Sequence, residues 1–486
     1  MAPLLPGSDR GQIAHYPDDQ LRSTTSTLCS RLGRPGVDAK YPRDNRRRVR
    51  QNNGVCRYCR GSAQVHGFTH DLGLLRDRRF ALLLSARTIS VLGSAFSPVA
   101  LAFGILNLPG ATASTLSVVL TAQAVPMILF ILVGGVIADR LPRQRVMMAG
   151  ELLMAAGFFG LAAMLLTGWT PLAALGVGAA LSGIGTALAF PALTGIIPEV
   201  VPLDRLQAGN ALLGLGANAS RVAGAVLGGG TVVLFGGGWA LAVSGAMYAL
   251  AGALIAMLRL EPGDRSRGEG HSVLTDLRDG WREFSSRQWI WVVVAQFSLM
   301  VMAIQAGHGV LGPLIAKESL GGPAAWSAFL AGEAIGTIAG VALSLRLRPR
   351  RPILVAVLLC LPTALPYALL GVDAPLWAIV AGAFVLGVCF DVFGVLWQTT
   401  MQREVPAESL SRVSSYDMLG SLMFGPIGLL VAGSAAGLFG TEESLLGCAI
   451  IIVVATLAAL LSPGVRNLRA PRPHDATDPG RQVTPT

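Results

Sequence analysis

The sequence carries little charge. Of its 486 residues, 14% are charged and 52% are hydrophobic, whereas a soluble domain has roughly 25% charged residues. This composition argues against an ordinary cytosolic enzyme. The charges that are present are unevenly spread, because long uncharged stretches follow Arg79 and short arginine-rich clusters separate them. The pattern is typical of a membrane protein that crosses the bilayer several times.

Other features are missing, and each absence excludes a class of protein. The six cysteines are too few and too scattered for a disulfide scaffold. No GxxxxGK[ST] phosphate loop occurs, so ATP is not expected to drive the protein directly unless a partner subunit binds it. The apolar segments contain no cluster of His, Asp or Ser at one depth, so we expect no enzyme, cofactor or metal site. The net charge of +10 does not indicate nucleic-acid binding, because the basic residues alternate with apolar segments.

The first 70 residues differ from the rest of the chain. They are rich in Arg, Asp, Pro and Ser, and they contain no apolar run long enough for a signal peptide. We therefore expect a disordered extension over residues 1–70. A competing hypothesis is that translation starts near Val65, where the composition changes abruptly. Peptides from residues 1–60 at normal abundance would refute the late start.

Four residues of this extension resemble a zinc site: Cys56, Cys59, His66 and His70. Only six residues separate Cys59 from His66, whereas a zinc finger has about twelve between its second cysteine and its first histidine. The spacing therefore disfavours zinc binding.

Twelve membrane spans are predicted from Phe80 onward, because about 20 apolar residues are needed to cross a bilayer. We expect an all-α membrane protein of two six-helix bundles, residues 72–260 and 288–464, joined by a cytoplasmic linker, 261–287, and followed by a disordered tail, 465–486. The predicted spans are 80–106, 114–138, 145–167, 171–197, 207–235, 239–259, 288–316, 323–346, 351–371, 375–402, 410–437 and 442–462.

The arginines predict the orientation of the chain. Every second connection between the spans carries arginines, for example Arg140 and Arg143, then Arg205, then Arg346, whereas the connections between them hold none. By the positive-inside rule the arginine-bearing connections are cytoplasmic. We therefore expect a multi-pass protein of the cell membrane with both termini in the cytoplasm.

The two halves contain an internal repeat. The segment that begins at Glu199 resembles the segment that begins at Arg403, and a shift of 204 residues aligns their glycines. The aligned pairs are Gly216 with Gly420, Gly224 with Gly428, and Gly229 with Gly433. Parallel repeats of this kind build transporters whose substrate site lies between the halves, near the middle of the membrane.

The connection between spans two and three reads GGVIADRLPRQRVM. Gly135 allows a neighbouring helix to approach closely, and Asp139 can interact with the positive N-terminal end of a facing helix, for which span eleven is the candidate. Arg140, Arg143 and Arg145 can pair with acidic side chains or lipid headgroups. We interpret these five residues as a conformational latch. The competing interpretation, that the arginines only set the topology, leaves Gly135 and Asp139 unexplained.

This connection resembles the signature of the major facilitator superfamily, with Pro142 where the family usually has glycine and Gln144 where a basic residue is common. The segments PEVVPLDRLQAGNALL and SRVSSYDMLG resemble a bacterial exporter branch that includes enterobactin and macrolide efflux proteins. The resemblance covers about residues 72–464. It implies a twelve-helix major facilitator fold, alternating access, and efflux driven by the proton gradient.

Span five contains RVAGAVLGG, which is similar to the antiporter motif of the exporters in this family. Gly224, Gly228 and Gly229 match the motif, whereas Ala225 replaces its usual proline. The resemblance therefore favours export, on the basis of a degenerate motif.

Ionisable residues inside the spans are the candidates for coupling, because charges within a bilayer are costly and usually functional. Arg87 and Asp391 form the first expected pair for substrate or proton handling, and Glu333 and Arg221 are expected to form a bridge between the halves. Asp417 is expected to engage the latch arginines. As the proton carrier we rank Asp391 first and Glu333 second, so Asp391→Asn is expected to abolish proton-driven efflux.

The sequence as a whole predicts a secondary transporter. We expect proton-coupled efflux of small hydrophobic or amphipathic compounds, of the drug, macrolide or siderophore type. The alternative is a proton-coupled importer of a small metabolite on the same fold. We expect a monomer whose partners are a small-molecule substrate, protons and the lipid bilayer, and no nucleic acid.

Overall fold

The computed structural model describes residues 72–202, 205–258 and 281–469, and within these ranges a few helix side chains, including those of 132–140, are not described. All of these residues belong to one compact unit, Thr69–Thr486. The expectations for the extension 1–70, with its candidate zinc ligands, lie outside the described residues. So do those for most of the linker and of the tail.

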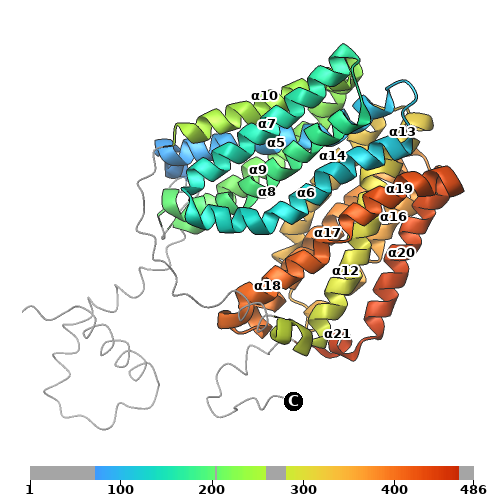
Figure 1. Ribbon diagram of the computed structural model, residues 1–486. Helices are drawn as coiled ribbons and strands as arrows, with labels where there is room; N and C mark the ends of the chain where they lie inside the picture. The colour runs from blue at the N-terminus through green and yellow to red at the C-terminus, as the bar shows by residue number, and fades with distance from the viewer. Residues whose placement is uncertain (1–71, 203–204, 259–280, 470–486) are drawn as a thin grey trace, which may run out of the picture. The chain divides into compact units, whose positions relative to one another are not determined.

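The described chain is helical, and twelve of its helical segments are long and apolar enough to cross a membrane. This confirms the predicted number of spans and the all-α class. In the first half, a short 3-10 helix, η2 (Leu72–Arg76), precedes six spans (Figure 1). These are α5 (Arg78–Leu106), α6 (Ala113–Arg140), α7 (Arg143–Thr167), α8 (Leu172–Val200), α9 (Leu206–Phe235) and α10 (Gly237–Ala256).

The second half begins with a helical turn at residues 281–286 and also has six spans, three of which are interrupted. The seventh span consists of α12 (Gln288–Ala306), a π-helical turn η4 (Gly307–Leu311) and α13 (Gly312–Glu318). The remaining elements are α14 (Pro323–Ser344), α15 (Pro352–Leu359), η5 (Pro362–Ala364), α16 (Leu365–Gly371), α17 (Leu376–Glu404), α18 (Ala407–Leu422), α19 (Gly425–Phe439), α20 (Thr441–Leu461) and α21 (Pro463–Asn467).

Successive spans run in opposite directions, so their connections gather at two ends. One end, called here the arginine-rich end, carries Arg143, Arg205 and Arg346. The other, called here the far end, carries the connections 107–112, 319–322 and Gly440. These two names are used below.

Each half is held together by helix packing around small residues. In the first half α5 packs against α9 and α10, while α7 packs against α8 and α10. A Cβ atom on Gly157 of α7 would lie 2.6 Å from the carbonyl oxygen of Gly178 on α8, so only glycine permits this approach. Such contacts stabilise helix pairs in lipid, where no hydrophobic effect draws helices together.

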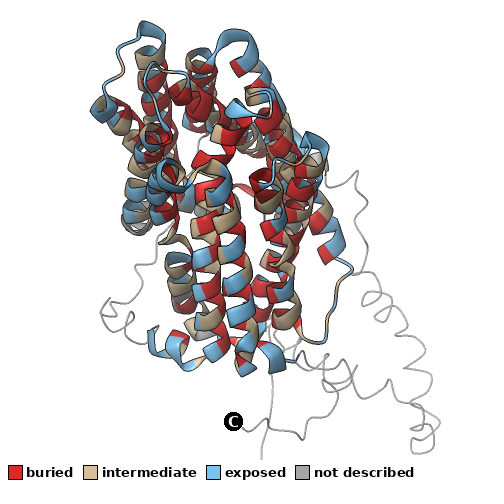
Figure 2. Cartoon of the chain, turned by 90° about the vertical axis from the view of Figure 1, so that its right-hand side faces the viewer, coloured by how far each residue is buried: buried red, intermediate tan, exposed pale blue. Residues whose placement is uncertain are grey.

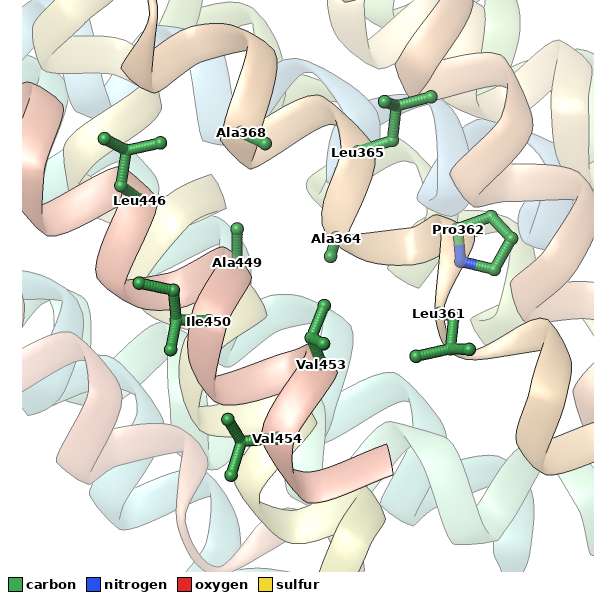
Figure 3. A pocket seen from close by; sticks show the side chains of 10 residues that line it. All are labelled: Leu361, Pro362, Ala364, Leu365, Ala368, Leu446, Ala449, Ile450, Val453 and Val454. Atoms are coloured by element: carbon green, nitrogen blue, oxygen red, sulfur yellow. The ribbon is translucent and has the colours of Figure 1, made fainter. Parts of the chain in front are cut away.

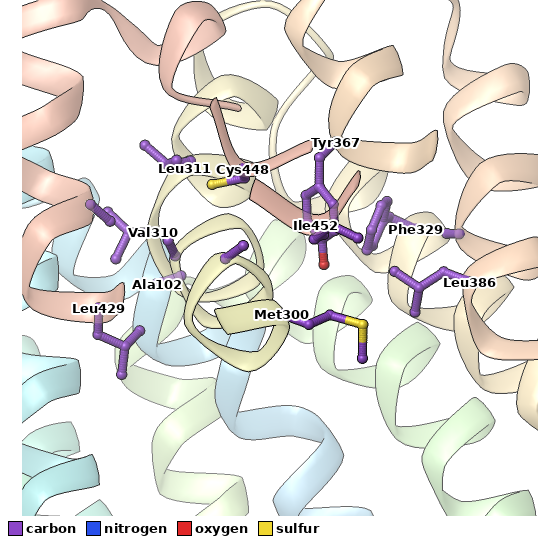
Figure 4. Packing of buried hydrophobic residues seen from close by; sticks show 14 of the residues in the cluster. Ala102, Met300, Val310, Leu311, Phe329, Tyr367, Leu386, Leu429, Cys448 and Ile452 are labelled. Atoms are coloured by element: carbon purple, nitrogen blue, oxygen red, sulfur yellow. The ribbon is translucent and has the colours of Figure 1, made fainter. Parts of the chain in front are cut away.

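The core of the second half also contains large side chains. Met300, Phe329, Tyr367, Leu386 and Ile452 come from five different spans and are at most 1% exposed (Figure 4). On the opposite faces of the helices many positions are exposed (Figure 2). These exposed positions include large apolar residues such as Leu438, which is 79% exposed, as expected for a surface in contact with lipid.

The repeated glycines have the same role in both halves. Gly216 and Gly224 of α9 pack against α5, where added Cβ atoms would meet Thr88 and Ala95. Their counterparts after the shift of 204, Gly420 and Gly428, pack in the same way against α12. The internal repeat is therefore a repeated packing of the fifth span on the first and of the eleventh span on the seventh.

Candidate functional site

A hydrogen-bonded chain of three side chains lies inside the second half. Nε2 of His308 lies 2.8 Å from Oε2 of Glu333, and Nδ1 of the same ring lies 2.6 Å from the hydroxyl oxygen of Tyr367. The three residues come from η4, α14 and α16, which are the seventh, eighth and ninth spans. Tyr367 is fully buried, whereas His308 and Glu333 are partly accessible.

Local backbone structure places His308 in this chain. The π-helical turn η4 widens the seventh span at His308, and such turns are frequent at functional sites. Gly307 and Gly312 border the turn, and a Cβ atom on either would overlap the ring of Tyr367 or of Trp326. The rings of Trp326, Phe329 and Tyr367 lie within 6.0 Å of the imidazole, centroid to centroid. The histidine is therefore held in a mostly apolar surrounding, with two polar partners.

The expected bridge between Glu333 and Arg221 is absent from this structure. Glu333 pairs with His308, whereas Nη1 of Arg221 donates to Oδ1 of Asn218 on its own helix, at 3.1 Å. Neither interaction crosses between the halves. The physical reason is that a histidine partner, His308, lies within Glu333's own half.

Arg87 and Asp391 are not joined either. Within the described residues Arg87 forms no hydrogen bond or ion pair, and Oδ2 of Asp391 is buried without a hydrogen-bond partner. The charge of Arg221, rather than that of Arg87, acts on Asp391. Asp391 packs beside Gly340 of α14, where a Cβ atom on the glycine would approach the Asp391 Cβ to 2.9 Å.

Asp417 on α18 has partners other than the latch arginines. Its Oδ2 accepts a hydrogen bond from Nε1 of Trp397, at 3.0 Å, and its Oδ1 accepts one from Ser421, at 3.4 Å. It forms no ion pair among the described residues. The indole of α17 satisfies the carboxylate within the same half, so the expected contact with the latch is not formed in this structure.

The latch is described only in part. Nη1 of Arg143 lies 3.1 Å from Oε1 of Glu199, and both side chains are more than one-third exposed, so this pair contributes little to stability on its own. Arg145 is exposed. The side chains of Gly135, Asp139 and Arg140 lie outside the described ones, so their proposed role stays a prediction.

Sequence reasoning missed one buried carboxylate. Glu151 of α7 is 1% exposed, its Oε1 accepts a hydrogen bond from the Ser90 hydroxyl at 2.9 Å, and its Oε2 has no partner. The charge of Arg87 acts on it. The signal was visible in the sequence, since Glu151 is an acidic residue in an apolar span, where ionisable side chains are usually functional.

The two halves contact each other at the far end. The backbone N–H of Gly433 on α19 donates to the hydroxyl of Ser117 on α6, at 2.8 Å, and the ammonium of Lys317 donates to the carbonyl of Leu106. Gly229 of α9 lies against Ser327 of α14. Gly229, the last glycine of the antiporter-like motif, therefore lies where the two halves meet, and so does its repeat, Gly433. The other two glycines of the motif, Gly224 and Gly228, pack on α5.

An apolar groove of about 470 Å³ lies away from these charges, between the interrupted ninth span and α20 (Figure 3). No ionisable side chain lines it, so it cannot handle a proton or a substrate charge. Its lining residues are Leu361, Pro362, Ala364, Leu365, Ala368, Leu446, Ala449, Ile450, Val453 and Val454.

Comparison with known proteins finds relatives that align with most of the chain. The enterobactin exporter EntS of Citrobacter koseri is 26% identical over 432 residues, which cover 83% of this chain and 96% of that protein. EntS of Shigella boydii is 27% identical over 414 residues, with 80% of this chain and 94% of that protein covered.

Solved structures share the fold at low sequence identity. The nucleoside transporter NupG superposes with a TM-score of 0.64 at 14% identity, over 79% of this chain and 98% of that one. A bacterial homolog of the human lysosomal transporter Spinster, in an inward-facing and unoccupied conformation, gives a TM-score of 0.61 at 18% identity, over 80% and 97% of the two chains.

The profile of one family covers most of the chain. It matches residues 80–425, which include the signature connection, the first copy of the repeat, most of the second copy and all three members of the hydrogen-bonded chain. The twelve spans and the two similar halves agree with that match. The chain therefore belongs to the Major Facilitator Superfamily of membrane transporters.

Proposed function

We propose that the protein is a proton-coupled exporter of small hydrophobic or amphipathic compounds and works by alternating access. The observation that carries the proton coupling is the chain Tyr367–His308–Glu333 inside the membrane-spanning region. The exporters among its relatives support the direction of transport. The contacts at the far end support alternating access, because two halves that meet at one end can separate there and close at the other.

Glu333 can bind a proton and remain hydrogen-bonded to His308. When Glu333 is ionised, Nε2–H of His308 donates to it and the hydroxyl of Tyr367 donates to Nδ1. When Glu333 is protonated, its O–H donates to Nε2, and Nδ1–H of the other tautomer donates to the hydroxyl oxygen. A carboxyl group that is hydrogen-bonded in both states can bind and release a proton during each transport cycle.

Glu333 therefore ranks ahead of Asp391 as the proposed proton carrier. Asp391, the first choice from the sequence, has one buried oxygen without a hydrogen-bond partner and no histidine among the partners of its carboxylate. Its role is proposed below to be electrostatic. The prediction that Asp391→Asn abolishes proton-driven efflux stays untested, and it provides a direct comparison with Glu333→Gln.

The direction of transport is tested in inside-out vesicles. With an acidic lumen, an exporter that exchanges substrate for protons is expected to accumulate the fluorescent amphipath N-phenyl-1-naphthylamine in the lumen, and a protonophore is expected to abolish the accumulation. Vesicles without the protein provide the baseline. Uptake only in right-side-out vesicles, driven by a proton gradient directed inward, would instead identify the importer.

A further inference from the structure

Two arginines lie at the same level on two packed helices of the first half. The helices are α5 and α9, and both run from the arginine-rich end to the far end. The Ser220 hydroxyl, near the midpoint of α9, donates to the carbonyl oxygen of Thr88, about one turn before the midpoint of α5, at 2.9 Å. Arg87 directly precedes Thr88 in the chain, and Arg221 directly follows Ser220.

Helix geometry turns both arginines to the same side of this contact. Each residue of an α-helix is rotated by about 100° from the one before it, because 3.6 residues make a turn. Two parallel helices that face each other present opposite faces at their contact. A step of one residue back on one helix and one residue forward on the other therefore turns both side chains toward the same side of the pair. Arg87 is one residue before the contact on α5, and Arg221 is one residue after it on α9. The two guanidinium charges lie close enough to repel each other, and Arg87 also lies near Tyr248 of α10 and Glu151 of α7.

In the described part of the chain neither guanidinium group is held in an ion pair, although the charge of Glu151 acts on Arg87 and that of Asp391 lies near Arg221. Among the described residues, the one hydrogen bond of Arg221 goes to the uncharged Asn218. Arg221 is exposed and Arg87 is partly exposed. The nearby carboxylate Glu151 is bound by Ser90 and almost completely buried, so it faces the interior of the half. Two positive charges thus lie close together within the membrane-spanning region.

Two guanidinium groups that lie close together in a membrane repel each other, and an anion placed between them would offset that cost. Guanidinium groups bind carboxylate, sulfonate and phosphate oxygens through paired N–H donors in a fixed geometry. We propose that Arg87 and Arg221 bind an acidic group of the transported compound. This inference rests on the proposed function and narrows its substrate class to amphipathic organic anions, which excludes cationic compounds as the main substrates.

Asp391 provides the competing anion. It belongs to the second half, and the charges of Asp391 and Arg221 are close enough to interact. When the substrate leaves, the carboxylate can neutralise Arg221 in its place. The same arginine then interacts with the substrate in one part of the cycle and with the other half in another part, which links substrate release to the movement of the halves.

The test compares two probes that share one ring system, the anion 1-anilinonaphthalene-8-sulfonate and the uncharged N-phenyl-1-naphthylamine. Saturable binding of each is measured on the purified full-length protein in lipid nanodiscs, with empty nanodiscs subtracted. Arg87→Gln and Arg221→Gln are each expected to weaken binding of the sulfonate about tenfold, which corresponds to the loss of one charged hydrogen bond. Binding of the uncharged probe is expected to change less than twofold.

Arg346→Gln is the matched control, because Arg346 is an exposed arginine of the arginine-rich end. It is expected to bind both probes as the original protein does. The proposal is overturned if the Arg87 and Arg221 variants bind the sulfonate as tightly as the control, if both probes lose affinity in parallel, or if the unmodified protein shows no saturable binding of the sulfonate. Continued proton-driven export of the uncharged probe in any of these cases would leave the proposed function standing.

Discussion

Replacing Glu333 by glutamine is expected to abolish proton-driven transport, down to the rate of vesicles without the protein. Glutamine has nearly the same shape as glutamate and can still hydrogen-bond to Nε2 of His308, but it cannot bind and release a proton. Movement of the uncharged probe down its own concentration gradient should continue, because the fold and the pathway are retained. The measurement is probe flux in proteoliposomes, with and without an imposed pH gradient.

Two further variants make this prediction specific. Glu283→Gln removes a carboxylate that pairs with Arg287, 2.7 Å away at the arginine-rich end, and it is expected to leave proton-driven flux unchanged. Asp391→Asn is expected to lower the rate while keeping its dependence on the pH gradient, since Glu333 is intact. If Asp391→Asn loses that dependence while Glu333→Gln keeps it, the proton belongs to Asp391, as the sequence first predicted.

The sequence predicted the spans because their formation depends mainly on one quantity, the hydrophobicity of the segment. A helix in lipid must be apolar over about 20 residues, so the twelve segments could be counted directly. The repeated glycines were predictive for a similar reason, because small residues mark close helix contacts, and Gly216 and Gly420 do make equivalent contacts.

Hydropathy did not reveal the interruptions of the spans. The seventh, ninth and eleventh spans were each predicted as continuous, whereas the structure changes helix type or geometry at η4, at η5 and between α18 and α19. Hydropathy depends on side chains and is insensitive to the hydrogen-bonding ladder of the backbone. Prolines, at Pro362 and Pro426, were the available signals for two of the breaks, because proline lacks the N–H that an intact helix needs.

The hydrogen-bond and ion-pair partners of the charged side chains were the least predictable part of the candidate site. His308 and Glu333 lie 25 positions apart on neighbouring spans, and their contact depends on the π-helical turn that sets the direction of His308. The sequence suggested a bridge between Glu333 and Arg221 because both are charged residues within the spans, yet position along a span gives no information on which way a side chain points. Rotation about the helix axis is decided by packing, which a single sequence does not show.

Replacing Gly433 by alanine is expected to separate the two halves at the far end. A Cβ atom there would lie 2.6 Å from Cα and 2.8 Å from the backbone nitrogen of Ser114 on α6, and backbone atoms cannot move aside as a flexible side chain can. Overpacking of this kind costs about 1–3 kcal/mol, which corresponds to a change of about 5- to 150-fold in the equilibrium between two conformations. The new side chain disfavours only the state in which α6 and α19 touch.

The shift is measured as a distance between the halves. Spin labels on cysteines introduced at Thr112 and Thr441, in a protein whose natural cysteines are replaced, report the separation at the far end by pulsed electron paramagnetic resonance. Gly433→Ala is expected to move the distance distribution to longer values. Gly437→Ala is the control one turn further along α19, where an added Cβ atom meets nothing within 4 Å. If both variants give the original distribution, or if both shift it equally, contact between α6 and α19 at Gly433 does not control the opening of this end.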